Sequence, residues 1–349
     1  MNKILIIGLG LIGGSFAKAL RQQKISREIW AFDPDIATIN SAKNSKIIDG
    51  FAILDQDLQN FDLIVIATPL AFYKDILAKI SELDPKNSII IDLGSLKECV
   101  LKTLPQNLQK NFIACHPIAG SDKTGFDNSS SDLFFDKKFI ICRGKNTEEK
   151  FLKTIENIAI KIGAKPNFIE AKAHDEIYGL VSHLPQFLSF LTKEFSPEKQ
   201  NNDFIKNAFR LDNSSAEIWE DIFKMNRKNL EKFYIEFFDN LNDFATAIRQ
   251  KKYDELLTNL INIAAPLLET LPKPDFATLP QLSKVIFRLI IVVSYLKIKK
   301  IQNLQNYAGR GFKDFTSIIS VLKLDREILL KTIENEQKEV LSFIRKISL

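Results

Sequence analysis

The stretch KILIIGLGLIGGS, Lys3 to Ser15, decides the fold. The short strand-like run KILII is followed at once by glycines in a GxGxxG arrangement and then by the helical pattern SFAKALRQQ. Such glycines allow a tight turn and a close approach of the backbone, so that the N-terminus of the helix can face a pyrophosphate. The residues of this turn predicted to contact a dinucleotide are Gly8, Leu9, Gly10, Leu11, Ile12 and Gly13.

An acidic residue supports the cofactor prediction. Asp33 ends the second predicted strand, IWAFD, 20 residues after Gly13, where a carboxylate can accept hydrogen bonds from an adenosine ribose. The same charge would repel a 2′-phosphate, which favours NAD over NADP. Thr68 and Pro69 end the strand DLIVIATP at the carboxyl edge of the sheet and are also predicted to contact NAD. The alternative, a glycine turn without a ligand, is disfavoured because strand, helix and acid agree.

The chain divides into a strand-rich part and a helical part. Up to about Ala171, short β-branched runs alternate with helical stretches, which is the pattern of a parallel sheet built from βαβ units. After Ala171, apolar residues recur at spacings of three and four, as in helices. The predicted fold is therefore α/β, a Rossmann-type doubly wound parallel sheet domain followed by an all-helical domain. The predicted boundaries are 1–171 for the NAD-binding domain, 172–264 for the helical domain and 265–349 for a C-terminal helical extension.

The helical part contains a candidate repeat. The sets that share one spacing are Glu217, Ile218, Lys228, Phe233 and Glu327, Ile328, Lys338, Phe343. The tripeptide LPQ also occurs twice, at 184–186 and at 279–281. Two interpretations stay open, because amphipathic helices resemble one another by composition: the extension is a diverged duplication of the helical domain, or the likeness is accidental.

Composition narrows the class of protein. The net charge of +5 is spread without a long basic block, which argues against nucleic acid and membrane partners. Three cysteines without CxxC spacing indicate neither a metal site nor a disulfide framework, so a reducing cytoplasm is predicted. The opening apolar run is too short for a signal peptide. The segment Val285–Ile298 falls short of the roughly 20 residues that span a bilayer and is predicted to be a buried or interfacial helix.

The chain has three histidines. His116 ends the predicted strand NFIACH, at the sheet edge where the nicotinamide is expected, while His174 and His183 lie in AHDEIYGLVSHLPQ at the start of the helical domain. Hydride removal from a carbinol needs a partner for the hydroxyl proton, and an imidazole with a near-neutral pKa suits that role. Metal binding is disfavoured because no HxxxH or HxH spacing occurs.

Five ordered motifs resemble one family. GLGLIGGS, IDLGSLK, HPIAGSDKTG, HDxxxxxVSHLP and the WxDIFxxNR of Trp219 to Arg227 together resemble the prephenate dehydrogenases, which include arogenate and cyclohexadienyl dehydrogenases. The resemblance runs from Met1 to about Ala264. It implies a Rossmann domain joined to a helical substrate domain that carries the interface of a homodimer.

The resemblance also implies residue roles. His116 corresponds to the family histidine that hydrogen-bonds the ring hydroxyl of the substrate and polarises it. Ser95, in DLGS, corresponds to the serine that helps to orient that histidine and the nicotinamide. Arg210 corresponds to the arginine that grips the ring carboxylate, since it lies nine residues before Trp219 and its guanidinium offers a bidentate grip. The other implied substrate-binding residues are Ser121, Asp122, His174 and His183.

Two departures from the family pattern affect the expected site. Gln186 stands where the second histidine of SHLPH is usual. The family pattern G-F-R/K-D-x-T-R becomes FIKNAFR at 204–210, and a better copy appears later as GRGFKDFTS, 309–317, where Ser317 replaces the arginine. Either Arg210 binds the ring carboxylate and the later segment has a packing or dimerisation role, or the later loop supplies the positive charge through Arg310 or Lys313. The first account is favoured because the Trp219 context accompanies Arg210.

The predicted activity is NAD-dependent oxidative decarboxylation of prephenate or arogenate in tyrosine biosynthesis. No metal or covalent nucleophile is needed for it. Asp122 is a candidate for favouring the ammonium group of arogenate. Two alternatives remain: a two-domain β-hydroxy acid dehydrogenase, and a non-catalytic NAD-sensing protein on the same fold.

Overall fold

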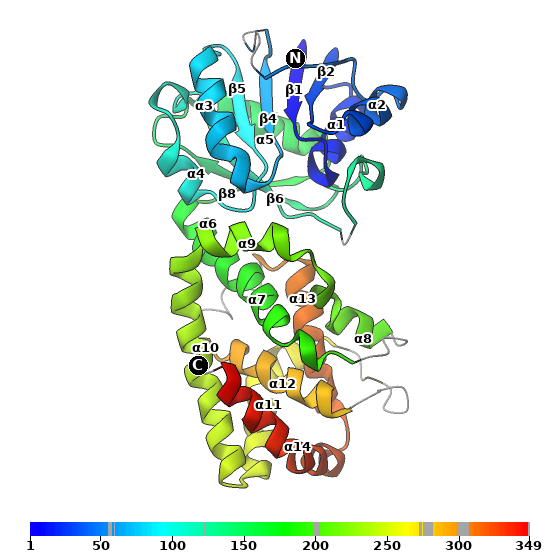
Figure 1. The fold of residues 1–349 in the computed structure, drawn as a ribbon, viewed down its shortest axis with the longest axis vertical. Helices are drawn as coiled ribbons and strands as arrows, with labels where there is room; N and C mark the ends of the chain where they lie inside the picture. The colour runs from blue at the N-terminus through cyan, green and yellow to red at the C-terminus, as the bar shows by residue number, and fades with distance from the viewer. Residues whose placement is uncertain are drawn as a thin grey trace. The chain divides into compact units, whose positions relative to one another are not determined.

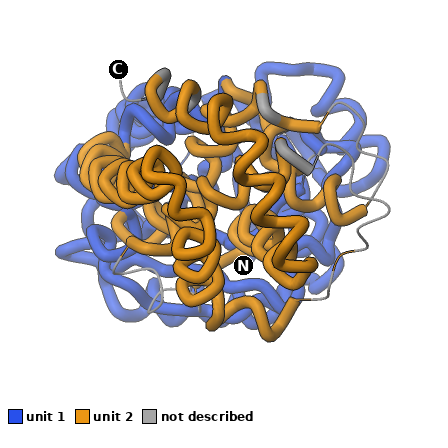
Figure 2. The backbone as a smooth tube through the Cα atoms, turned by 90° about the horizontal axis from the view of Figure 1, so that it is seen from below, with its two compact units in different colours: residues 1–175, 217–225 blue, residues 176–216, 226–349 orange. Residues whose placement is uncertain are grey.

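The computed structural model describes residues 1–54, 58, 60–121, 123–197, 203–271, 274, 282–298 and 307–347. The chain forms two compact units, which Figure 2 distinguishes by colour. Unit 1 comprises Met1–Asp175 and Glu217–Met225, and unit 2 comprises Glu176–Ala216 and Asn226–Leu349.

Unit 1 is built on an eight-stranded sheet with the order β3-β2-β1-β4-β5-β6-β7-β8 (Figure 1). Its strands are β1 (Lys3–Ile7), β2 (Glu28–Phe32), β3 (Gly50–Phe51), β4 (Leu63–Ile66), β5 (Ile89–Asp92), β6 (Phe112–Pro117), β7 (Lys138–Arg143) and β8 (Lys165–Phe168). β1 pairs in parallel with both β2 and β4, so the direction of winding reverses between β1 and β4. Ligands of doubly wound sheets bind at such a reversal, beyond the carboxyl ends of the strands.

The apolar composition of the central strands explains their position. Every residue of β4 (LIVI) and of β5 (IIID) is buried, and β1 (KILII) is exposed only in part at Lys3. Strands covered by helices on both faces need such continuous apolar runs. The helices that accompany the sheet are α1 (Leu11–Gln22), α2 (Ile36–Asn44), α3 (Tyr73–Leu83), α4 (Glu98–Thr103) and α5 (Glu149–Lys161).

The predicted parallel sheet is confirmed from β3 across to β6, with one difference beyond it. β7 runs antiparallel to β6, and His116 lies opposite Ile140 in this pairing. Between these two strands the described chain contains only the 3-10 turn η3 (Phe126–Asn128) and no crossover helix, so the chain can reverse direction. β8 is parallel to β7 because α5 supplies the crossover.

The remainder of the described chain is helical, as predicted. The helix α6 (Ala171–Tyr178) runs into a π-helical turn, η4 (Gly179–His183). The other helices are α7 (Leu184–Leu191), α8 (Asp203–Ala208), α9 (Ala216–Met225), α10 (Arg227–Arg249), α11 (Tyr253–Leu268), α12 (Leu282–Leu296), α13 (Arg310–Thr316) and α14 (Arg326–Ile347), with 3-10 segments η5 (Lys193–Phe195), η6 (Arg210–Asn213) and η9 (Ser317–Lys323). α9 belongs to unit 1, and the others after α6 belong to unit 2.

The most apolar helix, α12, is buried within unit 2, as its sequence predicts. Every residue from Val285 to Val293 is at most 3% exposed. α12 packs against α10, α11 and α14 (Figure 1). Within the described ranges, no helix has both the length and the apolar character needed to cross a membrane.

Candidate active site

The glycine turn after β1 forms a cradle. Gly8 has a φ of +95°, which favours glycine, and a Cβ on Gly13 would lie 1.9 Å from the carbonyl oxygen of Gly8. These two glycines therefore let strand and helix approach each other closely. A Cβ on Gly10, in contrast, would meet nothing within 4 Å. The helix α1 that begins here has no acidic residue in its first turn and no side-chain cap, so its N-terminal N–H groups suit a phosphate.

Two polar side chains stand beside this turn. Asp33, directly after β2, accepts hydrogen bonds from the N–H of Leu9 at 2.8 Å and from the N–H of Asp35 at 2.9 Å, which fixes its carboxylate at the end of the strand. The hydroxyl of Thr68, two residues after the end of β4, is buried and has no hydrogen-bond partner among the described residues. The methyl group of Thr68 would lie 3.0 Å from a Cβ on Gly8. The carboxylate of Asp33, the hydroxyl of Thr68 and the open space at Gly10 thus fit a dinucleotide. The next residue after Thr68, Pro69, is exposed.

His116 lies in a series of hydrogen-bonded side chains. Its Nδ1 is 2.9 Å from Nε2 of His174, and Nδ1 of His174 is 2.8 Å from Oδ1 of Asp175. The Asp175 carboxylate also accepts hydrogen bonds from the N–H groups of Lys97 and Glu98, at 2.8 and 2.9 Å. An acceptor with three donors is held in a fixed orientation.

The protonation states of this series follow from its geometry. His174 is fully buried, and burial lowers its pKa against the opposing effect of Asp175, so the ring is neutral near pH 7. Because a carboxylate cannot donate, the hydrogen of His174 is on Nδ1 and its Nε2 is an acceptor. Nδ1 of His116 must then donate to it. In neutral His116 this leaves Nε2 as the acceptor nitrogen.

A buried ion pair lies beneath the turn that carries Ser95. Asp92, the last residue of β5, pairs with the ammonium of Lys97, and both side chains are completely buried. Lys97 Nζ also donates to the carbonyl oxygen of Cys115, 2.6 Å away, next to His116. Burial raises the pKa of Asp92, while Lys97 lowers it. This pair joins the ends of β5 and β6 and so positions both Ser95 and His116.

The structure departs in detail from the sequence-based picture of this site. Ser95 lies in the predicted turn, but in the described part of the chain no hydrogen bond joins it to His116, whose Nδ1 is bound to His174 instead. Asp92, Lys97 and Asp175 were not predicted at all. The adjacent pair HD at 174–175 was the one available signal for Asp175.

The segment after β6 is described only in part. Ser121 is exposed, and its hydroxyl accepts a hydrogen bond from the N–H of Lys123 at 3.1 Å. Asp122 lies outside the described residues. Their predicted positions near substrate therefore stay predictions.

The other predicted substrate residues belong to unit 2. His183 is buried in η4, with its Nδ1 3.0 Å from the side-chain amide of Asn226 at the start of α10. Gln186 is also buried: its amide donates to the carbonyl oxygen of Leu211 at 2.8 Å and accepts from the hydroxyl of Ser214 at 3.2 Å. The amide that replaces the usual histidine therefore ties α7 to η6.

Arg210 and the later motif segment lie together in unit 2. Nε of Arg210 is 2.5 Å from Oδ2 of Asp314, and Nε of Arg310 is 3.5 Å from the same oxygen. The arginine and the aspartate of the family pattern, separated in this sequence, are thus brought into contact. Only part of the Arg210 guanidinium is used by this pair, because its two NH2 groups lie beyond Nε.

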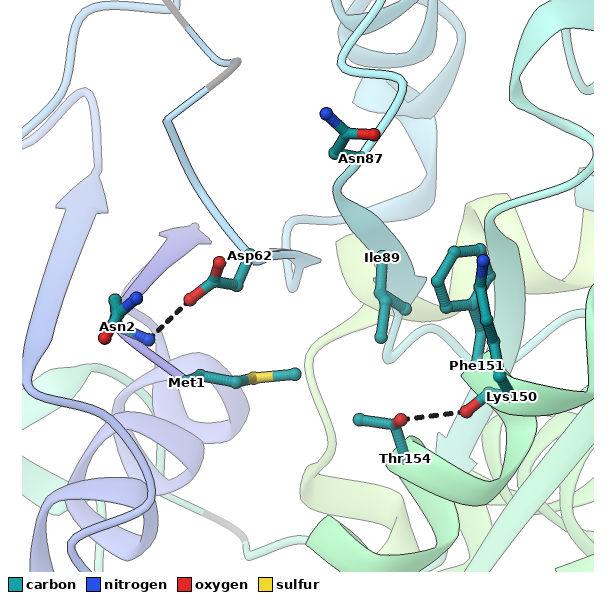
Figure 3. A pocket seen from close by; sticks show the side chains of 8 residues that line it. All are labelled: Met1, Asn2, Asp62, Asn87, Ile89, Lys150, Phe151 and Thr154. Atoms are coloured by element: carbon teal, nitrogen blue, oxygen red, sulfur yellow. Dashed lines mark hydrogen bonds between the residues drawn. The ribbon is translucent and has the colours of Figure 1, made fainter.

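The thiols of Cys99 and Cys142 and one surface hollow lie outside the site described above. Burial raises the pKa of Cys99 to about 11 and that of Cys142 to about 12, so both thiols stay protonated. Across the described residues, no group of three His, Cys, Asp or Glu side chains could hold a metal ion. A surface hollow lined by Asp62, Ile89 and Phe151 lies at the amino ends of β4 and β5, the edge opposite the glycine turn (Figure 3).

Comparison with known proteins identifies the family. Residues 16–168 match the model of the prephenate dehydrogenase nucleotide-binding domain, and residues 170–262 match that of the prephenate dehydrogenase dimerization domain. The chain belongs to the prephenate dehydrogenase family. The match begins after the glycine turn, and neither model extends past residue 262.

This chain is also similar to individual members of the prephenate dehydrogenase family. A cyclohexadienyl dehydrogenase of Zymomonas mobilis is 29% identical over 266 residues, 73% of this chain and 91% of that protein. A prephenate dehydrogenase of Lactococcus lactis is 33% identical over 193 residues, 54% of this chain and 52% of that protein. The crystal structure of prephenate dehydrogenase from A. aeolicus, in complex with hydroxyphenyl propionate and NAD+, has a TM-score of 0.70 at 29% identity and covers 77% of this chain and 98% of that one.

Proposed function

We propose that this chain is an NAD-dependent dehydrogenase that converts prephenate to 4-hydroxyphenylpyruvate, or arogenate to tyrosine, in tyrosine biosynthesis. The observation that carries the proposal is the series Asp175, His174 and His116 at the carboxyl edge of a sheet that also presents a dinucleotide turn. NAD, when bound, accepts the hydride that leaves the ring carbinol carbon. The bond between the ring carbon and its carboxylate then breaks, carbon dioxide leaves, and the electron pair that stays in the ring makes it aromatic.

His116 is the proposed catalytic residue. As the carbinol carbon loses its hydride, its hydroxyl proton becomes acidic, and Nε2 of His116 is the acceptor nitrogen for it. His174 and Asp175 are positioning residues, because they decide which nitrogen of His116 carries the hydrogen. When the ring becomes aromatic, the proton can return from Nε2 to the phenol oxygen.

The remaining roles are assigned by sequence position and side-chain chemistry. Ser95 stands in the turn fixed by Asp92 and Lys97 and is proposed to orient the nicotinamide. Arg210 is proposed to bind a substrate carboxylate through its NH2 groups. Ser121, Asp122 and His183 are retained as proposed substrate contacts.

The two parts of the chain have different proposed tasks. Residues 1–171 are proposed to bind NAD through the glycine turn, Asp33, Thr68 and Pro69, and residues 172–264 to bind substrate. The A. aeolicus relative with NAD+ bound supports the cofactor assignment. The dimerization-domain match at 170–262 supports the association of two such helical domains.

The activity is tested by NADH formation, followed by absorbance, with prephenate and arogenate offered separately and with NAD and NADP compared. Turnover with NAD and one of the two substrates is expected. His116→Asn should lower kcat by about 10²- to 10⁴-fold, the usual contribution of general acid–base catalysis, because an amide cannot accept the proton.

The affinity for NAD, measured by fluorescence titration, serves as the control. It should be unchanged in His116→Asn, since the glycine turn and Asp33 are not altered. Folded protein that binds NAD but turns over neither substrate would contradict the proposed function. Equal turnover by wild type and His116→Asn would contradict only the role of His116.

A further inference from the structure

The segment that follows the family match repeats the first helical part in structure. FIKNAFR at 204–210, within α8 and η6, aligns without gaps with GFKDFTS at 311–317, within α13 and η9. The alternation of exposed and buried residues is the same along both stretches except at one position, where Asn207 is exposed and Asp314 is partly buried. The two stretches therefore bury the same face, as two copies of one unit would.

The lengths of the elements agree with this alignment. The offset between the copies is 107 residues at the motif and 110 at Glu217 and Glu327. The 3-10 segment in between has four residues in η6 and seven in η9, which accounts for the difference of three. In both copies a long helix follows, α10 after the short α9 in the first and α14 in the second. We therefore treat α7, α8 and η6 as equivalent to α12, α13 and η9, and α9 with the first half of α10 as equivalent to α14.

Some contacts between the two copies fit a twofold relation, whereas those of α10 with α12 and of α7 with α13 have no marked counterpart. α8 packs against its own equivalent α13, and α10 packs against α14, whose second half is its equivalent. The contact between α8 and η9 is matched by the contact between α13 and η6. Equivalent elements that touch each other, and unlike pairs that occur in both directions, are the pattern of a twofold interface between two copies of one surface. In this chain both copies belong to the same polypeptide.

The residues at the interface between the copies are as buried as those of a protein core. α12 of the second copy is buried from Val285 to Leu296, and its Arg288 is completely buried. Arg288 binds both carboxylate oxygens of Asp212 in η6 of the first copy, at 2.7 and 2.8 Å, and the hydroxyl of Ser189 in α7 at 3.0 Å. Of the Arg288 nitrogens, only Nε is buried without a hydrogen-bond partner among the described residues. Largely apolar contact with few charges is typical of permanent subunit interfaces.

The two copies have diverged in a complementary way at the motif. The first copy keeps the arginine, Arg210, but has Asn207 in place of the aspartate, while the second keeps Asp314 but has Ser317 in place of the arginine. The retained residues form one ion pair across the interface, with side chains 22% and 13% exposed. The twofold-related position therefore has Asn207 and Ser317 and carries no charge pair. The chain therefore has one such arginine–aspartate pair, and it has one nucleotide-binding sheet.

We propose that residues 282–347 are a second copy of the helical domain, fused in cis, that takes the place of a partner subunit and supplies Asp314 to hold Arg210 for the substrate carboxylate. The chain is then active as a monomer. The part played by Arg210 rests on the proposed function, whereas the fused copy rests on the packing of unit 2 alone.

The first test is the mass of the full-length protein by size-exclusion chromatography with light scattering over a range of concentrations. A single chain of 39.8 kDa is expected at all of them. A stable particle of two chains would overturn the proposal that the second copy replaces a partner. This measurement needs no substrate, so it decides the matter even if neither prephenate nor arogenate is turned over.

The second test concerns Asp314. Asp314→Asn should raise KM for the ring substrate by about tenfold with little change in kcat, because Arg210 loses the carboxylate that orients it. KM for NAD should not change. In an Arg210→Gln background, Asp314→Asn should have no further effect, since two residues that act through one another are not additive. Glu327→Gln, which removes an exposed carboxylate from the same copy, is the matched control.

Two results would overturn the role of Asp314. One is an unchanged KM for the ring substrate in Asp314→Asn. The other is the same fold increase in KM whether Arg210 or Gln is present at position 210, which would indicate an effect that does not pass through Arg210.

Discussion

His174 has a buried imidazole whose charge would disrupt the series that holds His116. The groups facing it are Asp175 on its own helix, His116 on β6 and Lys97 in the turn after β5. Desolvation is the largest influence and lowers the pKa of His174 from 6.5. The folded protein therefore binds this proton less readily than the unfolded chain does.

A pH dependence of stability follows from that difference. Above about pH 6.5 both states have a neutral His174, whereas below it the unfolded chain takes up a proton that the folded state resists. The free energy of unfolding should decrease as the pH is lowered below about 6.5. His174→Gln should remove this part of the pH dependence. Urea unfolding from pH 5 to 8 measures it. A difference between wild type and variant that stays constant over this range would contradict the prediction.

The residue scale also shows what the sequence could and could not predict about the site. The place of His116 in the sheet was predictable, because the carboxyl ends of parallel strands lie at the edge where such sheets bind ligands. Its contact with His174 was not, because it joins residues 58 apart through the return of α6 to the end of β6. The buried pair of Asp92 and Lys97 is five residues apart in sequence and has no pattern that distinguishes it from a surface pair.

At the scale of elements, the junction of β1 and α1 separates two kinds of glycine. Gly10→Ala should fold normally, because a Cβ there meets nothing within 4 Å and the φ of −68° suits alanine, but the methyl group would occupy the approach to the pyrophosphate. Gly13→Ala should destabilise the protein, because its Cβ would overlap the carbonyl oxygen of Gly8. Thermal unfolding and the KM for NAD distinguish the two.

The expected outcome is a crossed pattern. Gly10→Ala should raise the KM for NAD by about tenfold or more at an unchanged Tm, whereas Gly13→Ala should lower Tm by several degrees. A lowered Tm in Gly10→Ala, or an unchanged KM for NAD, would argue against the cradle assigned to this turn.

The elements of the sheet were predictable in proportion to their burial. The strands from β1 to β7 that were predicted have apolar or β-branched runs, whereas β3 has two residues and β8 reads KPNF, which gives no strand signal. Both lie at the edges of the sheet. An edge strand is specified by pairing with its neighbour more than by its own composition, so periodicity could not find it.

At the scale of the molecule, duplication could not be decided from sequence. The two copies share few identities, and amphipathic helices resemble one another by composition. The proposed second copy rests instead on packing, which depends on which faces meet. The ion pair of Asp212 and Arg288 joins the two proposed copies, with side chains 2% and 0% exposed.

The cohesion of the two copies can therefore be tested at Arg288. Arg288→Met should lower the free energy of unfolding by about 3–5 kcal/mol, because it leaves the carboxylate of Asp212 buried without its cation. Adding Asp212→Asn should restore part of the loss, since the neutral amide can keep the hydroxyls of Ser189 and Ser196 as partners. Arg326→Met, which breaks an exposed pair with Asp254, should cost less than about 1 kcal/mol. Urea unfolding measures all three, and equal losses for Arg288→Met and Arg326→Met would mean that the pair of Asp212 and Arg288 does not hold the copies together.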